Sequence, residues 1–548
     1  MLRRQLMIVL SLIMVIGLVL SACSSNPSND KTSKNSSQKD NNDNKQGEGT
    51  SATEEYKLPF ANDDVTLTFA GVDSWSPNIT HNDNLPIFQE MEKRTGVKIN
   101  WQMHPFSQYN TSIQTRLAAG KDLPDIFAIP PFGAGADVVR YGSEGILLPL
   151  DEYINEQNAP NIVKLFEEHP DLKKILTSPD GHIYAVGELM KKVNTLNPRV
   201  YMLRKDWLDN LGLSEPETAD DWYNMLKAFK EQDPNGNGQA DEIPMIVSHG
   251  FADYSLLGSA FGIYPGSNIW INENGKLYYQ YDQPAFKEFL TFLNKLYNEG
   301  LLDPEFASND EKKTISMVAK GNVGTTPHQL PVVDRYNKDI ANSGIEGEYI
   351  PVLPPVNMEG ERYIIKRSPM GGRYGVLKDT KHPEIAVKWI DYLWASEEGL
   401  LLQNFGIEGQ SYTMKDGKPV FTEYITNNPD GLSPIDSLRK LGAFPSFLSH
   451  QLYDFKTQTT PEKVVQFADG AQEYMIEPFP SMLGTSEEVE ELSSLIVDIT
   501  TYEDEMIQKF VMGNKPISEF DNFVSTLKRM GIERVVEIKQ TQYDRSNQ

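Results

Sequence analysis

The chain contains a single cysteine, Cys23, and this residue lies at the end of an apolar N-terminal run. One cysteine excludes a disulfide framework within the chain, cysteine-rich zinc sites and iron–sulfur clusters. Any folded body must therefore be stabilised mainly by the burial of apolar side chains. The length of 548 residues is sufficient for two or three domains with a sizeable core.

The first residues have the pattern of a secretion signal. Arg3 and Arg4 precede an apolar run over residues 6–20, which is typical of a signal peptide and is shorter than the ~20 residues of a membrane-spanning helix. The following Leu20, Ser21, Ala22 and Cys23 resemble a bacterial lipobox. This resemblance implies that residues 1–22 are a lipoprotein signal peptide and that Cys23 carries the lipid, including palmitate. The alternative is an uncleaved membrane anchor.

Residues 23–57 are predicted to be a disordered linker behind the lipidated cysteine. Residues 24–51 contain no Val, Ile, Leu, Met, Phe, Trp or Tyr and consist largely of Asn, Ser, Lys, Asp and Gln. Such a segment cannot bury enough apolar surface to offset the entropy lost on ordering. We expect it to hold a folded body at the extracytoplasmic face of the cell membrane, since lipid chains anchor a protein at a bilayer surface.

Charge and motif content narrow the function. Lys and Arg number 51 against 77 Asp and Glu, which gives a net charge of −26 and argues against a nucleic-acid partner. The sequence has no His-Glu-x-x-His, no Gly-x-Ser-x-Gly and no complete P-loop. We expect no enzymatic activity, although the absence of local motifs does not by itself exclude an enzyme. A surface polysaccharide-cleaving enzyme remains an alternative, because catalytic groups can converge from distant positions.

The start of the folded body alternates between strand and helix patterns. Strands are predicted at 65–69, 97–103 and 125–129, with helices between them at about 85–91 and 108–119. This order indicates βαβ units, a mostly parallel sheet and an α/β fold.

Oxygen-bearing side chains alternate in one loop, as they do in an EF-hand. The residues are Asp233, Asn235, Asn237, Gln239 (through its backbone carbonyl), Asp241 and Glu242. Position twelve is Pro244 instead of glutamate, so Glu242 must act as the late carboxylate. Hard oxygen ligands favour Ca²⁺, and we expect a single structural calcium site. The alternative is a polar turn without metal.

Several local patterns resemble extracellular solute-binding proteins of the family-1 sugar-binding type, in particular the LplA-like and alginate-binding lipoproteins of ABC sugar importers. They occur in a characteristic order at residues 118–126, 145–150, 203–208, 300–306 and 405–412. The resemblance implies a two-lobed periplasmic-binding-protein-like α/β fold with a hinge between the lobes. It also implies a monomer that captures an oligosaccharide and delivers it to the permease subunits of an ABC transporter. The calcium loop is similar to one that holds calcium in the alginate-binding proteins.

The resemblance sets expected domain boundaries. Lobe 1 comprises residues 58–190 plus 376–398, and lobe 2 comprises 198–372 plus 400–548 and carries the calcium loop. The segment 373–377 is expected to be a hinge strand that returns to lobe 1.

Ligands of open α/β sheets bind beyond the carboxyl ends of the strands, and sugars favour aromatic faces beside polar groups. The candidate ligand-binding residues are Asp73, Trp75, Phe132, Glu188, Arg204, His249, Trp270, His328, Glu408 and Tyr412. For Arg204, a buried structural pair with a carboxylate is an equal alternative. For the whole protein, capture of a peptide or another solute and a role as a sensory co-receptor are the alternatives.

Overall fold

The computed structural model describes residues 57–61, 65–74, 79–130, 135–190, 193–443, 448 and 450–547. The predicted signal peptide, Cys23, nearly all of the predicted linker, and the candidate residues Trp75 and Phe132 lie outside these ranges. Within them, no helix combines the length and the apolar character needed to cross a bilayer.

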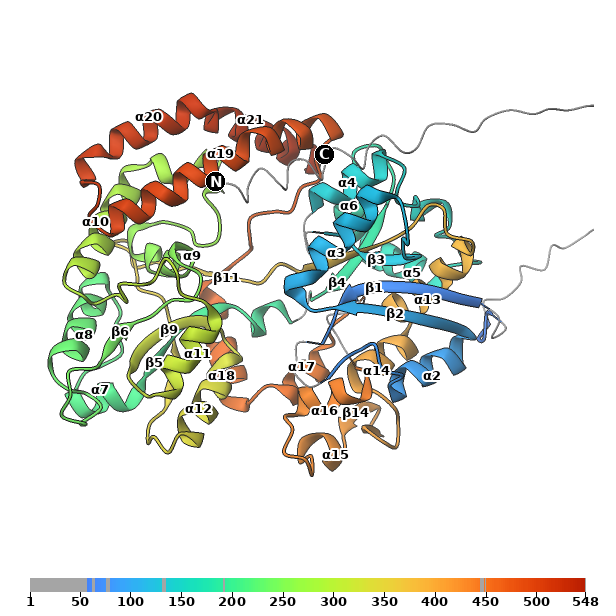
Figure 1. Ribbon diagram of the computed structural model, residues 1–548, viewed down its shortest axis with the longest axis horizontal. Helices are drawn as coiled ribbons and strands as arrows, with labels where there is room; N and C mark the ends of the chain where they lie inside the picture. Colours follow the sequence, from blue (N-terminus) through green and yellow to red (C-terminus); the bar gives the residue numbers. More distant parts are fainter. Residues whose placement is uncertain are drawn as a thin grey trace, which may run out of the picture. The chain divides into compact units, whose positions relative to one another are not determined.

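The first sheet has five strands in the order β2-β1-β3-β12-β4 (Figure 1). They are β1 (Val65–Val72), β2 (Val97–His104), β3 (Ile126–Ala128), β4 (Ala185–Leu189) and β12 (Met370–Val376). Strand β1 runs parallel to β2 and β3, whereas β12 runs antiparallel to both β3 and β4. The N-terminal end of β12 therefore lies at the same edge as the carboxyl ends of β1, β3 and β4.

Helices α2 (Pro86–Thr95) and α3 (Phe106–Ala119) connect these strands, as the βαβ pattern predicts. Helix α2 ends at Gly96, whose φ is 72°. A Cβ atom at this position would lie 1.8 Å from the backbone oxygen of Ala61. Glycine is therefore required both for the left-handed conformation and for the close approach of the two backbones.

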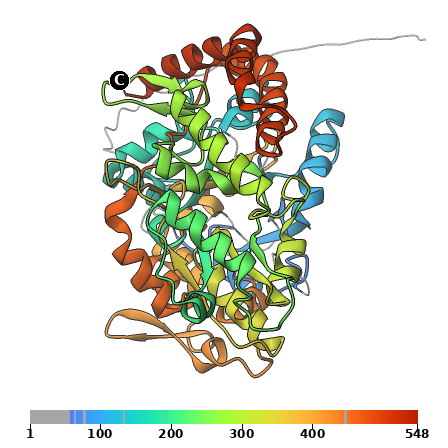
Figure 2. The ribbon, with the colours of Figure 1, turned by 90° about the vertical axis from the view of Figure 1, so that its left-hand side faces the viewer.

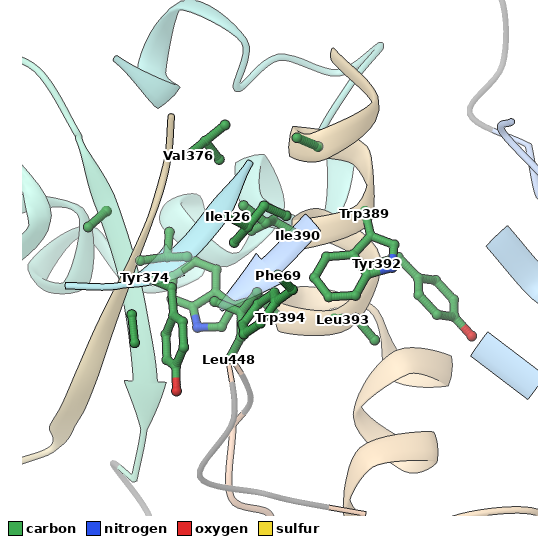
Figure 3. Close-up of a cluster of buried hydrophobic side chains, with 14 of the residues drawn as sticks. Phe69, Ile126, Tyr374, Val376, Trp389, Ile390, Tyr392, Leu393, Trp394 and Leu448 are labelled. Carbon is green, nitrogen blue, oxygen red and sulfur yellow. The ribbon is translucent and has the colours of Figure 1, made fainter. Parts of the chain in front are cut away.

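Aromatic side chains fill the core beneath the first sheet (Figure 3). The ring of Phe69 lies 5.7 Å from that of Tyr374 and 5.9 Å from that of Trp389. Trp389 and Trp394 belong to α13 (Pro383–Ala395). The indole of Trp394 donates a hydrogen bond of 2.6 Å to the backbone oxygen of Gly187 on β4, so this buried ring has a polar partner.

The segment between residues 402 and 455 packs in the same core, although the sequence analysis assigned 400–548 to the second lobe. Leu402 and Phe405 of α14 (Glu397–Phe405) and Phe455 of α17 (Tyr453–Thr459) are buried there. The physical reason is that α14 follows α13 almost directly in the chain. Only Ser396, which caps α14, separates this helix from α13, and α14 packs back onto α13.

The second sheet has four strands in the order β10-β5-β9-β6. They are β10 (Tyr349–Val352), β5 (Arg199–Arg204), β9 (Val323–Gln329) and β6 (Ile243–Met245). Strand β5 runs antiparallel to β9 and β10, while β6 and β9 are parallel. The apolar side chains around this sheet form clusters separate from the first core.

The C-terminal helices complete the second core. They are α19 (Ser486–Val511), α20 (Phe520–Met530) and α21 (Ile532–Ser546), and α19 packs against both of the others and against α10 (Pro284–Asn298) (Figure 2). A capping box starts α19, since Thr485 and Glu488 each bond the other's backbone N–H.

The remaining helices and strands are short. They are α4 (Gly135–Ser143), α5 (Pro160–Glu168), α6 (Pro170–Leu176), α7 (Lys205–Leu211), α8 (Ala219–Glu231), α9 (Phe251–Tyr254), α11 (Glu311–Ala319), α12 (Val332–Asn342), α15 (Glu423–Thr426), α16 (Pro434–Leu441), α18 (Glu462–Gly470), β7 (Ile269–Ile271), β8 (Leu277–Tyr279), β11 (Ile364–Ile365), β13 (Tyr412–Lys415), β14 (Lys418–Phe421) and β15 (Met475–Ile476).

Candidate functional site

Asp73 lies directly after β1, at the carboxyl edge of the first sheet. Its carboxylate accepts hydrogen bonds from the backbone N–H groups of Ser74 and His81, both at 2.7 Å, and from the hydroxyl of Thr80 at 2.8 Å. The side chain is 15% exposed. Asp73 therefore shapes its own loop and retains a small accessible surface at the predicted edge.

Glu188 is buried on β4 at the same edge. Gln451 donates a hydrogen bond of 2.5 Å to its Oε1, and the backbone N–H of Gln451 donates to Leu189 at 2.8 Å. On the neighbouring strand β12, a Cβ atom at Gly371 would lie 2.2 Å from Oε2 of Glu188. The glycine leaves the space that the carboxylate occupies.

Positive charge collects near Glu188, and the sequence analysis did not identify it. Burial, together with the guanidinium groups of Arg367 and Arg439, lowers the pKa of Lys456 on α17 to about 8, although Glu188 acts to raise it. These residues come from three distant parts of the chain and belong to no local motif. No sequence signal marked them.

His249 and His328 meet at the carboxyl edge of the second sheet, as their positions after β6 and at the end of β9 predict. His249 is half-exposed, and its Nδ1 lies 3.1 Å from Nη2 of Arg199. Arg199 forms an ion pair with the buried carboxylate of Asp253. The Nε2 atom of His328 lies 3.7 Å from the half-exposed Glu311.

The electrostatics of this edge keep His328 neutral. Burial, followed by the charge of Arg199, lowers the pKa of His328 to about 4. Its Nδ1 accepts a hydrogen bond of 2.8 Å from the backbone of Gln329, which leaves Nε2 as the protonated nitrogen. A buried N–H donor next to a cation and carboxylates suits the recognition of hydroxyl groups.

Arg204 ends β5, which runs antiparallel to β9, so it lies at the opposite edge of the second sheet from His328. Its Nε and Nη2 donate to Asp206 at 2.8 and 2.6 Å, and its Nη1 donates to the backbone of Gly321 at 2.8 Å. The guanidinium nitrogens therefore all donate hydrogen bonds to groups of the protein itself. These contacts match the alternative of a buried structural pair.

Trp270 belongs to an aromatic cluster built from three chain segments. Its ring stacks on that of Tyr264, with centroids 4.7 Å apart and an interplanar angle of 11°. Tyr264 also contacts Tyr363 at 4.5 Å, and Phe479 lies 6.3 Å from Trp270. Tyr264, Tyr363 and Phe479 are partly exposed, so the cluster offers flat apolar surface of the kind that sugars contact.

Glu408 and Tyr412 are neighbours in space but differ in burial. Glu408 is exposed, whereas Tyr412 is 6% exposed and its ring lies 5.8 Å from that of Phe405. Burial raises the pKa of the Tyr412 phenol. Tyr412 contributes mainly to the first core.

The predicted calcium loop, residues 233–242, is closed by its own side chains. Asp233 accepts hydrogen bonds from the backbone of Asn237 at 3.1 Å and of Gly238 at 2.9 Å. The amides of Asn235 and Asn237 point to Oδ1 of Asp241, at 3.3 and 3.1 Å. Among the described residues, no three His, Cys, Asp or Glu side chains form a group that could hold a metal ion.

One carboxylate oxygen of Glu242, at the end of this loop, nevertheless lacks a hydrogen-bond partner. This atom, Oε1, is buried. Burial raises the pKa of Glu242, and the nearby carboxylates of Asp241 and Asp233 raise it further. An uncompensated group of carboxylates and amide oxygens fits a hard cation.

Comparisons with known proteins agree with this architecture. The fructooligosaccharide ABC transporter substrate-binding protein FusA of Streptococcus pneumoniae is 28% identical over 91% of this chain and 94% of its own length. Lipoprotein LipO of Bacillus subtilis is 28% identical over 82% of this chain and 87% of its own. The crystal structure of the alginate-binding protein AlgQ2 without calcium ion superposes with a TM-score of 0.74, at 26% identity, over 90% of this chain and 100% of that one.

The likeness to AlgQ2 confirms the predicted two-lobed α/β fold. The family model of bacterial extracellular solute-binding proteins matches residues 77–399, which is more than half of the chain. This match also confirms the resemblance inferred from the local patterns. The chain belongs to the family of bacterial extracellular solute-binding proteins.

Proposed function

We propose that this protein captures an oligosaccharide outside the cell and delivers it to the permease of an ABC transporter. The observation that carries the proposal is the gathering of hydroxyl-binding side chains at the carboxyl edges of both sheets, where α/β proteins bind ligands. The full-length similarity to FusA supports the same class of ligand. The protein itself catalyses nothing and acts as a monomer.

The proposed ligand-binding residues are those whose surroundings leave them available at these edges. Asp73 and Glu188 would contact the ligand at the edge of the first sheet, and His249 and His328 would contact it at the edge of the second. Trp270 and its aromatic neighbours supply the flat surface. Trp75, Phe132, Glu408 and Tyr412 remain sequence-based candidates, and Arg204 is left out because its donors are occupied.

Binding is tested by calorimetric titration of the mature chain, residues 23–548, with neutral and acidic oligosaccharides. We expect saturable binding of at least one saccharide and an increase in Tm by mass action. Product release from the same saccharides would contradict the proposal and favour the cleaving enzyme. Binding of peptides without any saccharide would favour the other alternative.

The proposed location is the outer face of the cell membrane, with lipid on Cys23. The lipobox carries this part of the proposal, and LipO is named as a lipoprotein. Radioactive palmitate should label the wild-type protein, and Cys23→Ser should abolish the label and release the protein into the medium. Retention of Cys23→Ser on the membrane would favour an uncleaved anchor.

The residues of the 233–242 loop are proposed to hold structural Ca²⁺. Asp233, Asn235, Asn237, the Gln239 carbonyl, Asp241 and Glu242 would supply the oxygens, and the cation would neutralise the carboxylates that raise the pKa of Glu242. We expect a chelator to lower Tm and Ca²⁺ to restore it. Asp241→Asn should weaken this response, and an unchanged Tm would argue for a plain turn.

A further inference from the structure

One buried cation at the carboxyl edge of the first sheet has no anionic partner among the residues that the structure describes. Arg373 of β12 is 2% exposed. Its backbone oxygen accepts a hydrogen bond of 2.8 Å from Ile129, the residue directly after β3, and it pairs with Gly187 of β4. Arg373 therefore lies level with the carboxyl end of β3, where ligands of α/β sheets bind.

The guanidinium of Arg373 is uncompensated. Its Nη1 is buried without a hydrogen-bond partner. Burial alone lowers the pKa of Arg373 to about 10, and among the described residues no carboxylate offsets this effect. By contrast, Arg94 pairs with Glu90 and Glu398, and Arg199 pairs with Asp253.

The missing partner cannot reflect a shortage of carboxylates, because the chain contains 77 Asp and Glu residues. A charge buried without a counter-charge opposes folding strongly. Such a residue is expected where an anion from outside the protein completes the site. The planar fork of arginine matches the two oxygens of a carboxylate.

Further positive charge lies along the same edge. Lys456 is close enough to Arg367 and Arg439 for their charges to lower its pKa, and close enough to Glu188 for that carboxylate to raise it. The nearby Glu188 already accepts a hydrogen bond from Gln451. This edge is thus locally cationic on a strongly acidic protein, which favours entry and retention of an anion.

We infer that Arg373 binds a carboxylate of the captured saccharide, so that the ligand is an acidic oligosaccharide containing uronic acid residues. The inference rests on the proposed function and specifies its ligand class.

The test uses trimers of galacturonate, mannuronate and guluronate, each with its carboxyl-reduced neutral counterpart, titrated into the mature chain at low salt. We expect an acidic trimer to bind about 100-fold more tightly than its neutral counterpart. Arg373→Met should remove that preference by weakening the acidic trimer about 100-fold. It should leave the neutral trimer unchanged and raise the Tm of the unliganded protein.

Arg373→Lys is the companion variant, because it keeps the charge and loses the fork. We expect it to weaken the acidic trimer about tenfold. Arg204→Lys is the matched control in the second sheet, and it should change the acidic and neutral trimers equally. If Arg373→Met does not fold, unchanged binding of the acidic trimer by Arg373→Lys overturns the inference.

Two outcomes separate this inference from the function on which it rests. Binding of a neutral saccharide such as kestose, with no acidic trimer bound more tightly than its neutral counterpart, overturns the acidic ligand and leaves saccharide capture intact. Absence of binding to every acidic and neutral saccharide overturns both.

Discussion

Two buried arginines, one in each sheet, have opposite surroundings. Arg204 in the second sheet is 1% exposed, and its guanidinium donates to Asp206 and Gly321. Arg373 in the first sheet is 2% exposed, yet its Nη1 has no partner. Residue type and burial are the same, so only the partners distinguish the arginine that supports the fold from the one for which we infer a ligand.

The largest effect is expected from Arg204→Met. Removing one member of a buried pair leaves Asp206 uncompensated, which typically costs about 3–5 kcal/mol. We expect the free energy of unfolding, measured by urea denaturation, to fall by about 3 kcal/mol, because Asp206 is a quarter exposed. If Arg204→Met leaves the free energy of unfolding unchanged, the Arg204–Asp206 pair does not stabilise the fold and the two arginines no longer differ in this respect.

The second core supplies a titrating carboxyl as the next test. Glu503 of α19 accepts hydrogen bonds from Tyr279 and Asn268. Burial raises its pKa from 4.5 to about 7. Between pH 4.5 and about 7, the carboxyl of Glu503 is protonated in the native state and ionised in the unfolded chain. Its contribution to stability is therefore greatest below pH 4.5 and is lost as the pH rises to about 7.

Glu503→Gln should remove this dependence. At about pH 7.5 we expect it to raise the free energy of unfolding by up to about 3 kcal/mol. The gain should vanish near pH 4.5, where the carboxyl is protonated in both states. Chemical denaturation across this range provides the measurement, and a pH-independent difference between variant and wild type would contradict the assignment.

The first core should show the opposite dependence through His450. Its ring lies 5.2 Å from that of Trp394, and burial lowers its pKa from 6.5 to about 3. Stability from this neutral histidine is present above pH 6.5 and is lost as the pH falls toward 3. At about pH 5, His450→Gln should lessen the acid-induced loss by about 2 kcal/mol.

The smallest expected effect on stability is a gain from Arg373→Met. Replacing an uncompensated buried charge by an apolar side chain of similar length should raise the free energy of unfolding by about 1 kcal/mol in the unliganded protein. Calorimetric unfolding measures it. A large decrease in the free energy of unfolding would instead assign Arg373 a structural role like that of Arg204, and the two arginines would then not differ in role.

Local patterns predicted the elements that depend on near neighbours. The strands around Phe69, Trp101 and Phe127 were identified correctly because hydrophobic periodicity acts within a few residues. The oxygen alternation of the 233–242 loop is likewise local, and its proposed use by calcium remains a prediction.

The candidate site was predictable only in part. The sequence could place His249 after β6 and His328 near the end of β9, and their use by a ligand remains a prediction. The surroundings of Lys456 and Arg373 could not be predicted, because they depend on groups far along the chain. The predicted lobe boundary at residue 400 likewise missed the packing of residues 402–455 on the first core.

The sequence alone contains the lone cysteine and was enough to indicate the α/β alternation and the family, since these depend on composition, spacing and order. The secretion signal is a prediction from the same local patterns. Only the tertiary structure decided which buried charges are paired. Arg204 lies two residues from its carboxylate, but what surrounds Arg373 is set by β4 and β3, which are distant in sequence. The free energy of a buried charge depends on everything within a few ångströms of it, and chain order does not specify that distance.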